Sequence, residues 1–520
     1  MIRNLAPFIT LAALLSCSER NNNSYQVTRI GQGYQIPYFE DSARAEKILL
    51  YKSVIDSIFS KSARANHNPS IAYGIVVDDK LIYSHAVGYA NLEKKIAADS
   101  RSRFRIASMT KSFTAMCILR LRDEGKLLLS DPVAKYIPEM ASLKYPTGDS
   151  SPITIFNLLT MSAGFPEDNP WGDRQLSDTD QELIDLVKNG ISFSTTPGSQ
   201  FEYSNLGYGL LGRIISNVSG QHYQNYVIDK ILRPLGMNDC EFEFEKIPPE
   251  KLALGYRWED KVWKPEALLK DGSYAAMGGM ICTLDDFAKY MSFLLTAWPP
   301  RKEDEIGPVK RNSAREMQHP WMFRGLAPEY KTHSGELCPR TSSYAFGLGW
   351  RVDCRGVVSV THSGGLPGFG SVHILLPDFG VGIVAFSNLT YANMGAPATE
   401  ALDTIVILAD LKRRVLPVSP TLEKMQDEIV KLLPDWKEQH DALFAENFFP
   451  DISKTHRKKE TDELLSKIGK IISVGKMHPE NLLRGSFDLI GENGTIKVYF
   501  TLTPEAEPKV QYLSFSFIKK

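Results

Sequence analysis

The stretch Ser108-Met109-Thr110-Lys111 opens a run of residues with helical spacing that continues to Glu124. Side chains three residues apart share one face of a helix, so the Lys111 amine can reach the Ser108 hydroxyl. A serine hydroxyl becomes a strong nucleophile when a neighbouring base takes its proton, and a lysine with a lowered pKa can act as that base. The positive end of the helix dipole at the first turn also favours a developing alkoxide. The stretch therefore predicts that Ser108 is a catalytic nucleophile.

The same Ser-x-x-Lys spacing occurs at Ser473/Lys476 and Ser516/Lys519, so the tetrapeptide alone is not decisive. Both of these pairs lie in a C-terminal stretch with strand-like alternation, where side chains three residues apart point to opposite faces. The sequence context therefore selects Ser108.

A second candidate is Tyr203-Ser204-Asn205, which follows a Pro-Gly turn and precedes a predicted helix that Asn205 can cap. A tyrosine beside cationic groups can have its phenol pKa lowered enough to serve as a base or an acid. The alternative for Tyr203 is an ordinary interface aromatic whose hydroxyl is satisfied by a hydrogen bond.

A third candidate is His362-Ser363-Gly364-Gly365, at the end of a predicted strand. Glycines at this place let a substrate lie against the strand edge and leave a backbone N–H free to bind an oxyanion. The alternative is that His362 is structural, as many histidines at strand ends are.

Taken together and in this order, the three elements resemble the three motifs of class C β-lactamases. Related esterases and D-amino-acid peptidases of the same fold share these motifs. Two further stretches fit the resemblance: Leu-Leu-Thr-Met-Ser-Ala-Gly at residues 158–164 is similar to the family's "LLTHTSG" segment, and residues 276–283 are similar to its "AGGLxST" segment. The similarity covers roughly residues 45–410.

The resemblance implies a role for each position. Ser108 would be the acylated nucleophile, and Lys111 and Tyr203 would share the proton transfers, with either as the base. The backbone N–H groups of Ser108 and Gly365 would form the oxyanion hole. The substrate and oxyanion positions would be Asn205, His362, Gly364 and Gly365.

The sequence departs from β-lactamases proper at His362, where those enzymes carry a lysine. A lysine supplies a permanent charge for the carboxylate of a β-lactam, whereas a neutral imidazole supplies little. The His-Ser-Gly triplet in place of Lys-Thr-Gly resembles the esterase and D-aminopeptidase branch. We therefore expect acyl transfer but not efficient β-lactam turnover.

The order of strand-like and helix-like segments predicts the fold class. Strand patterns at residues 70–77, 80–87 and 346–387 bracket a helical and loop-rich region from about residue 130 to about residue 340. We expect an α/β (α+β) fold of the β-lactamase/transpeptidase type, with an antiparallel sheet flanked by helices and an inserted helical subdomain. The predicted domain covers residues 42–412, and residues 413–421 form a Pro-containing linker. Residues 422–520 form a small α+β domain that faintly resembles NTF2-like domains.

The N-terminus carries a targeting signal. Residues 1–17 show a positive start, a short apolar run and a closing cysteine, Cys17, which resembles a bacterial lipoprotein signal with Cys17 as the lipidation site. Residues 18–41 would be a tether. The alternative is an ordinary signal peptide that contains a cysteine. We expect secretion across the inner membrane and a lipid anchor in the cell envelope, in the periplasm or at the outer membrane or cell surface.

Composition excludes several functions. The net charge is −1, with 60 basic and 61 acidic residues interspersed, which does not favour nucleic-acid binding. The sequence holds no GxSxG, HExxH or Walker A motif, and the GxGxxG at residues 207–212 lies inside a predicted helix, so we expect no metal and no cofactor. Cys117 falls in an apolar helical run. Cys338 and Cys354 flank a short segment and could form a disulfide in an oxidising compartment.

The predicted function is that of a serine hydrolase acting through an acyl-enzyme. Its substrates would be small esters, amides or D-amino-acid-containing peptides of the envelope. The alternative is a penicillin-binding-type or catalytically weak lipoprotein that binds its ligand without turnover. The intact Ser/Lys/Tyr set favours the enzyme. The helical insert shapes the pocket, so the natural substrate cannot be read from the sequence.

Overall fold

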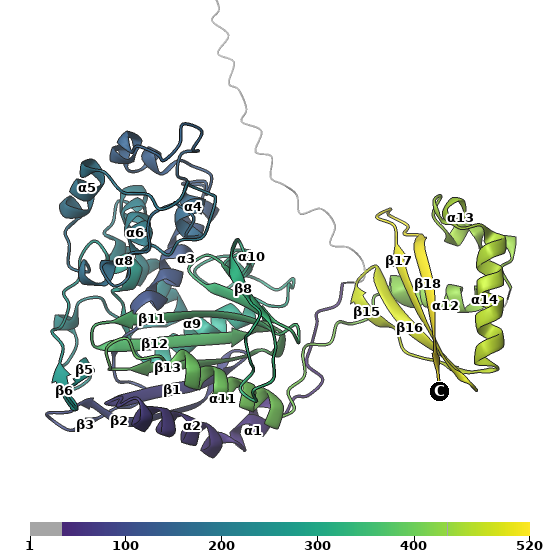
Figure 1. The fold of residues 1–520 in the computed structure, drawn as a ribbon, viewed down its shortest axis with the longest axis horizontal. Coiled ribbons are helices and arrows are strands. Elements are labelled where there is room, and N and C mark those ends of the chain that lie inside the picture. Colours follow the sequence, from purple (N-terminus) through teal and green to yellow (C-terminus); the bar gives the residue numbers. More distant parts are fainter. Residues whose placement is uncertain (1–33, 434) are drawn as a thin grey trace, which may run out of the picture. The chain divides into compact units, whose positions relative to one another are not determined.

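The computed structural model describes residues 34–433 and 435–520. The chain divides into two compact units, one of Pro37–Val415 and one that includes Leu416–Lys520. Cys17 lies outside the described residues. Figure 1 shows the larger unit in purple to green and the smaller one in yellow-green.

The larger unit is built on one antiparallel sheet of nine strands, in the order β3-β2-β1-β13-β12-β11-β10-β9-β8. Strands from the N-terminal and C-terminal parts meet where β1 pairs with β13, as the sequence predicted. The strands are β1 (Ser70–Val77), β2 (Lys80–Asn91), β3 (Ile96–Ala97), β8 (Met322–Ala327), β9 (Arg340–Tyr344), β10 (Gly349–Asp353), β11 (Val358–Leu366), β12 (Phe369–Leu376) and β13 (Val381–Ser387).

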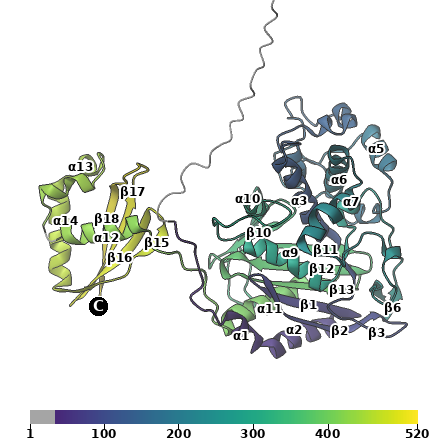
Figure 2. The same ribbon diagram turned by 180° about the vertical axis from the view of Figure 1, so that it is seen from behind.

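Helices cover both faces of this sheet (Figures 1 and 2). On one face, α1 (Arg44–Leu49), α2 (Lys52–Ala65) and α11 (Gly395–Leu408) bury a cluster that includes Ile55, Phe59 and Ile405. On the other face, α9 (Leu284–Thr296) packs against β1, β2 and β13. Strand β1 is buried along its whole length, because helices lie on both sides of it.

The region between β4 and β8 is mainly helix and loop, and most of it corresponds to the insert predicted from about residue 130 to about residue 340. Its helices are α3 (Thr110–Asp123), α4 (Ile155–Leu159), α5 (Asp180–Asn189), α6 (Asn205–Ser219), α7 (Tyr223–Val227), α8 (Ala275–Gly278), α9 and α10 (Arg311–Glu316). Two short ladders lie within or beside it: β4 (Phe104–Arg105) with β7 (Ile281–Cys282), and β5 (Tyr256–Glu259) with β6 (Val262–Pro265).

The end of this region differs from the prediction. The sequence pattern indicated helix and loop up to about residue 340, but β8 at Met322–Ala327 extends the sheet there. Both faces of β8 are largely exposed, because it is the edge strand of the sheet. An edge strand with so little burial lacks the apolar alternation from which strands are predicted.

The smaller unit packs helices on a second antiparallel sheet. Its helices are α12 (Pro420–Leu432), α13 (Phe448–Asp451) and α14 (Lys454–Ile468). Its strands are β14 (Ile471–Val474), β15 (His478–Asn481), β16 (Arg484–Gly491), β17 (Gly494–Leu502) and β18 (Val510–Lys519). The strand-like alternation of the C-terminal stretch corresponds to β16, β17 and β18. The resemblance to NTF2-like domains stays a prediction.

Two disulfides lie within the larger unit. One joins Cys338 to Cys354, the pairing that the sequence left open. The other joins Cys240 to Cys282, which are 42 residues apart and gave no sequence signal. Cys117 is buried with a free thiol. In the described part of the chain, every helix is too short or too polar to cross a membrane.

Candidate active site

Ser108 lies in a tight turn between the sheet and the helical insert. The turn is a 3-10 segment, Ala107–Met109, directly before α3, so Ser108 precedes the α-helix instead of opening it. Ala107 has a φ of 50°, which is unusual for a residue with a side chain. The Ser371 hydroxyl of β12 donates to the Ile106 carbonyl at 2.7 Å and ties the turn to the sheet.

Gly364 of β11 lies directly under this turn. A Cβ at Gly364 would be 2.2 Å from the Ile106 carbonyl oxygen and 2.3 Å from the Ser371 hydroxyl. Real Cβ atoms do not approach so closely, and the Ile106 carbonyl belongs to the backbone, which cannot move aside easily. Gly364 therefore allows the Ser108 turn to rest on the strand, and its part in the site is close packing.

Lys111 links two of the predicted catalytic segments, those of Ser108 and Asn205, to helix α8. Its side chain is fully buried. The Nζ donates to Ser108 Oγ at 3.0 Å, to Asn205 Oδ1 at 2.7 Å and to the Met277 carbonyl at 2.7 Å. Met277 belongs to α8, within the stretch that resembled the family's "AGGLxST" segment. Burial lowers the pKa of Lys111 to about 7, although the carboxylates of Asp173 and Asp168 act in the opposite direction. A substantial fraction of the amine is therefore neutral near pH 7.

Two aspartates act on Lys111, Asp173, which is buried, and Asp168, which is partly buried, and the sequence reasoning missed both. Asp168 accepts the backbone N–H of Asn205 at 2.6 Å and of Leu206 at 2.8 Å, so it satisfies free donors at the start of α6. Asp173 accepts the Tyr391 hydroxyl at 3.1 Å. Burial raises the pKa of Asp173 to about 6, against the effect of Lys111. No local motif marks these residues, because each meets its partner through tertiary structure.

Tyr203 stands beside the Ser108–Lys111 pair. Lys111 Nζ lies 4.9 Å from the centre of the Tyr203 ring. Burial raises the pKa of Tyr203 well above its usual value, and the neighbouring Tyr344 adds to this, while the Ser108 hydroxyl acts in the opposite direction. The sequence suggested a pKa lowered by cationic neighbours, but burial raises it instead. The Tyr203 phenol is therefore protonated at neutral pH.

His362 faces the same site from β11. Its Nε2 lies 3.0 Å from the Tyr344 hydroxyl and its Nδ1 lies 2.6 Å from the Ser363 carbonyl. A carbonyl only accepts, so these partners assign the proton to Nδ1 and make Nε2 the acceptor of the Tyr344 hydroxyl. Burial, with a further contribution from Lys111, lowers the pKa of His362 well below its usual value. The imidazole is therefore neutral.

The edge of β11 is open next to these residues. Strand β10 pairs with β11 only from Val358 to Thr361. On the other side, β12 pairs with β11 as far as Leu366. Within the described residues, the stretch 362–366 therefore has a partner strand on one side only. Backbone groups on the open side are available to a substrate.

A cavity of about 970 Å³ opens along this edge. The predicted residues that line it are Ser108, Tyr203, His362 and Gly365. Lys111 and Asn205 lie buried behind Ser108, and Gly364 is under the turn. Asp173 and Tyr391 also line the cavity. Among the described residues, no cluster of His, Cys, Asp and Glu is suited to hold a metal ion.

Comparisons with known proteins identify the family of the chain. The Beta-lactamase family model matches residues 55–406. Protein flp of Staphylococcus aureus (strain COL) is 30% identical over 340 residues, which cover 64% of this chain and 62% of flp. Beta-lactamase-like protein 2 of Dictyostelium discoideum is 32% identical over 256 residues, which cover 48% of this chain and 46% of that protein. The chain thus spans less than two thirds of the length of these relatives.

Two solved structures share the fold. The octameric penicillin-binding protein homologue from Pyrococcus abyssi matches with a TM-score of 0.57 at 21% sequence identity. The match covers 90% of this chain and 96% of the homologue's chain. The penicillin-binding protein from Bacillus halodurans matches with a TM-score of 0.54 at 21% sequence identity, and the match covers 68% of this chain and 99% of that protein's chain. The predicted fold class is therefore confirmed: a β-lactamase/penicillin-binding-protein-like fold with helices on a large antiparallel sheet. The chain belongs to the Beta-lactamase family, whose members are generally serine hydrolases.

Proposed function

We propose that the protein is a serine hydrolase that works through an acyl-enzyme on small esters, amides or D-amino-acid-containing peptides of the cell envelope. One observation carries the proposal. The Ser108 hydroxyl lies 3.0 Å from the amine of a buried lysine whose pKa is lowered to about 7. An amine with this pKa can take the serine proton at neutral pH and return it later in the cycle.

In the proposed acylation step, Ser108 Oγ bonds to the carbonyl carbon of the substrate as its proton passes to Lys111 Nζ. The carbonyl oxygen becomes an oxyanion, which the backbone N–H groups of Ser108 and Gly365 stabilise. Collapse of the tetrahedral intermediate breaks the bond to the leaving group, which departs with a proton. Water then bonds to the acyl carbon and gives a proton to the neutral Lys111 amine. The bond from that carbon to Ser108 Oγ breaks, Oγ takes the proton back from Lys111, and the carboxylic acid leaves.

We assign the role of base to Lys111 and the role of proton donor to Tyr203. Burial shifts both pKa values, but it favours the neutral amine for Lys111 and the protonated phenol for Tyr203. A neutral amine accepts a proton, whereas a protonated phenol can only donate one. Tyr203 would therefore protonate the leaving group and recover its proton from the Lys111 ammonium.

We place the protein in the esterase and D-aminopeptidase branch of the family. The neutral His362 supports this, because it offers no permanent positive charge at the position of the β-lactamase lysine. A carboxylate directly beside the reacting carbonyl, as in a β-lactam, would lack its usual cationic partner there.

We further propose that the mature protein is held in the cell envelope by a lipid on Cys17. The disulfides Cys240–Cys282 and Cys338–Cys354 support an oxidising compartment, since such bonds are rare in the bacterial cytosol. Metabolic labelling with a clickable palmitate should mark the wild type but not Cys17→Ser. Equal labelling of both proteins would refute the anchor.

A burst experiment with p-nitrophenyl butyrate tests the catalytic proposal. Wild type should release a burst of nitrophenol close to one equivalent, followed by steady turnover, and Ser108→Ala should show neither. The matched control is Ser473→Ala, because Ser473 has the same spacing to a lysine but is exposed in the smaller unit. Equal rates for wild type and Ser108→Ala would refute Ser108 as nucleophile. A burst without turnover would favour the ligand-binding alternative.

A further inference from the structure

Three arginines from three neighbouring strands line the cavity that contains Ser108. They are Arg324 of β8, Arg340 of β9 and Arg351 of β10. None of them belongs to the sequence motifs that mark the catalytic site. The strands that carry them continue the sheet from β11, so the arginines extend the site away from His362 along the sheet.

Within the described residues, none of the three arginines forms an ion pair or a side-chain hydrogen bond. Arg324 lies over the ring of Phe201 at 4.4 Å, and Arg340 lies over the ring of Tyr330 at 3.9 Å. These contacts orient the guanidinium groups but leave their N–H donors without acceptors.

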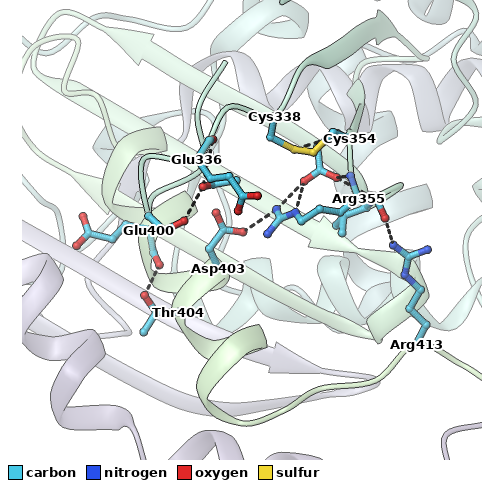
Figure 3. A network of polar contacts seen from close by, with 12 residues as sticks. Glu336, Cys338, Cys354, Arg355, Glu400, Asp403, Thr404 and Arg413 are labelled. Atoms are coloured by element: carbon cyan, nitrogen blue, oxygen red, sulfur yellow. Dashed lines mark hydrogen bonds and ion pairs between the residues drawn. A yellow bond between two sulfur atoms is a disulfide. The ribbon is translucent and has the colours of Figure 1, made fainter. Parts of the chain in front are cut away.

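The nearby carboxylates are occupied by other partners. Asp353, the cross-strand neighbour of Arg340, accepts Arg355 Nε at 2.9 Å and the backbone N–H of Arg355 at 2.9 Å. Figure 3 shows that Arg355 also reaches Asp403, beside the Cys338–Cys354 disulfide. Glu400, at the cavity wall, pairs with His333 at 3.4 Å. The local acids therefore do not neutralise the three cavity arginines.

The three guanidinium groups are close enough to repel one another. Burial and, to a smaller extent, the charges of Arg340 and Arg324 together lower the pKa of Arg351 to about 10. Arg324 also contributes to the lowered pKa of His362, which burial dominates. A concentration of like charge in a partly dehydrated cavity is unfavourable unless an anion binds there.

We infer that Arg324, Arg340 and Arg351 bind an anionic group of the substrate, a carboxylate or a phosphate, remote from the carbonyl that Ser108 attacks. This inference rests on the proposed function. Arginine suits both kinds of group, since its planar fork binds their oxygens in pairs. With His362 neutral, these arginines supply positive charge to the cavity, together with Lys331 at its wall and the charged fraction of Lys111.

The register of the sheet indicates how far this group lies from the reaction. Arg351 of β10 pairs with Ser359 of β11. Four residues further along β11 is Ser363, which lines the cavity next to the catalytic residues. Four residues of strand span about 13 Å. The anion would therefore be separated from the reacting carbonyl by roughly 10–13 Å, which describes an elongated acidic ester or peptide.

The test uses p-nitrophenyl half-esters of succinic, suberic and sebacic acid, each compared with its methyl-capped neutral form. We expect wild type to prefer the charged form at the suberic and sebacic lengths and not at the succinic length. In Arg340→Gln and Arg351→Gln, the ratio of kcat/KM for charged over neutral sebacic ester should fall at least tenfold. Arg257→Gln, which removes an exposed arginine of β5 that does not line the cavity, should keep the wild-type ratio. An unchanged ratio in both cavity variants would overturn the inference.

A binding measurement separates this inference from the proposed function. If wild type hydrolyses these esters no faster than Ser108→Ala, the proposed function fails. Calorimetric titration with sebacate and with inorganic phosphate still tests whether the three arginines bind an anion. Binding that weakens at least tenfold in an Arg340→Gln/Arg351→Gln variant supports the site. Tighter binding of phosphate or of sebacate then identifies the anion. No binding of either probe, or equal binding by wild type and the double variant, would overturn the inference.

Discussion

Replacing Asn205 by aspartate should disable the base without changing the shape of the site. Asn205 Oδ1 accepts a hydrogen bond from Lys111 Nζ at 2.7 Å, and an aspartate is nearly isosteric with asparagine. The substitution places a negative charge against the lysine that must be neutral to take the Ser108 proton. Asn205→Asp should therefore raise the pKa of Lys111 from its present value of about 7.

The size of the effect follows from this contact. Opposite unit charges 2.7 Å apart attract by about 6 kcal/mol at an effective dielectric constant of about 20. Desolvation of the new carboxylate offsets a large share of this attraction. If about half of the attraction remains, its about 3 kcal/mol raises the pKa of Lys111 by about 2 units. At pH 7 the neutral fraction of the amine then falls by a factor of roughly 50, and the rate of acylation falls with it.

The assay is kcat/KM for p-nitrophenyl butyrate between pH 5 and pH 10. In Asn205→Asp, the acid limb of the profile should move about 2 pH units upward, and the rate should recover at high pH. Asn225→Asp is the matched control, because Asn225 also follows a tyrosine by two residues but is exposed. A folded Asn205→Asp protein whose acid limb stays near pH 7 would refute Lys111 as the base, as would a loss of activity that high pH does not restore.

Three further predictions follow from the structure. In wild type, kcat/KM should rise about tenfold per pH unit below pH 7 and level off above it, because the neutral form of Lys111 increases through its pKa of about 7; a flat profile from pH 5 to pH 8 would contradict this. Gly364→Ala should lower the free energy of unfolding by about 1–3 kcal/mol and reduce activity, since its Cβ would meet the Ile106 carbonyl. Gly148→Ala, whose Cβ would meet no atom within 4 Å, should melt close to wild type, and equal melting temperatures for both would count against the packing argument. Replacing Cys338 and Cys354 together by serine should cost about 3 kcal/mol in urea unfolding, because the bond closes a loop with a sequence separation of 16; an unchanged urea midpoint would show that the disulfide adds no stability.

The sequence predicted the frame of the fold because its signals are local. Strand β1 is a continuous apolar run and β2 follows after a two-residue turn, so their hairpin could be predicted from residues close together. The closeness of Lys111 and Ser108 is local in the same way, since three residues of helix separate them. Edge strand β8 could not be predicted, because an exposed edge carries no periodic apolar pattern.

The electrostatic character of the site depends on tertiary structure. Asp168 lies 37 residues before the backbone N–H that it binds, and Asp173 lies 218 residues from Tyr391. The sign of the Tyr203 pKa shift required knowledge of its burial. The three cavity arginines share no motif, and only the pairing of β8, β9 and β10 brings them together.

The central claim is that Ser108 forms a covalent acyl-enzyme, and peptide mass spectrometry tests it directly. The protein is mixed with p-nitrophenyl acetate, quenched in acid within the burst and digested with trypsin, which cuts after Arg105 and Lys111. We expect the peptide Ile106–Lys111 to carry one acetyl group, located on Ser108 by fragmentation and lost over time as water regenerates the enzyme. An unmodified Ile106–Lys111 peptide during active turnover, or an acetyl group that forms equally in Ser108→Ala, would contradict the account.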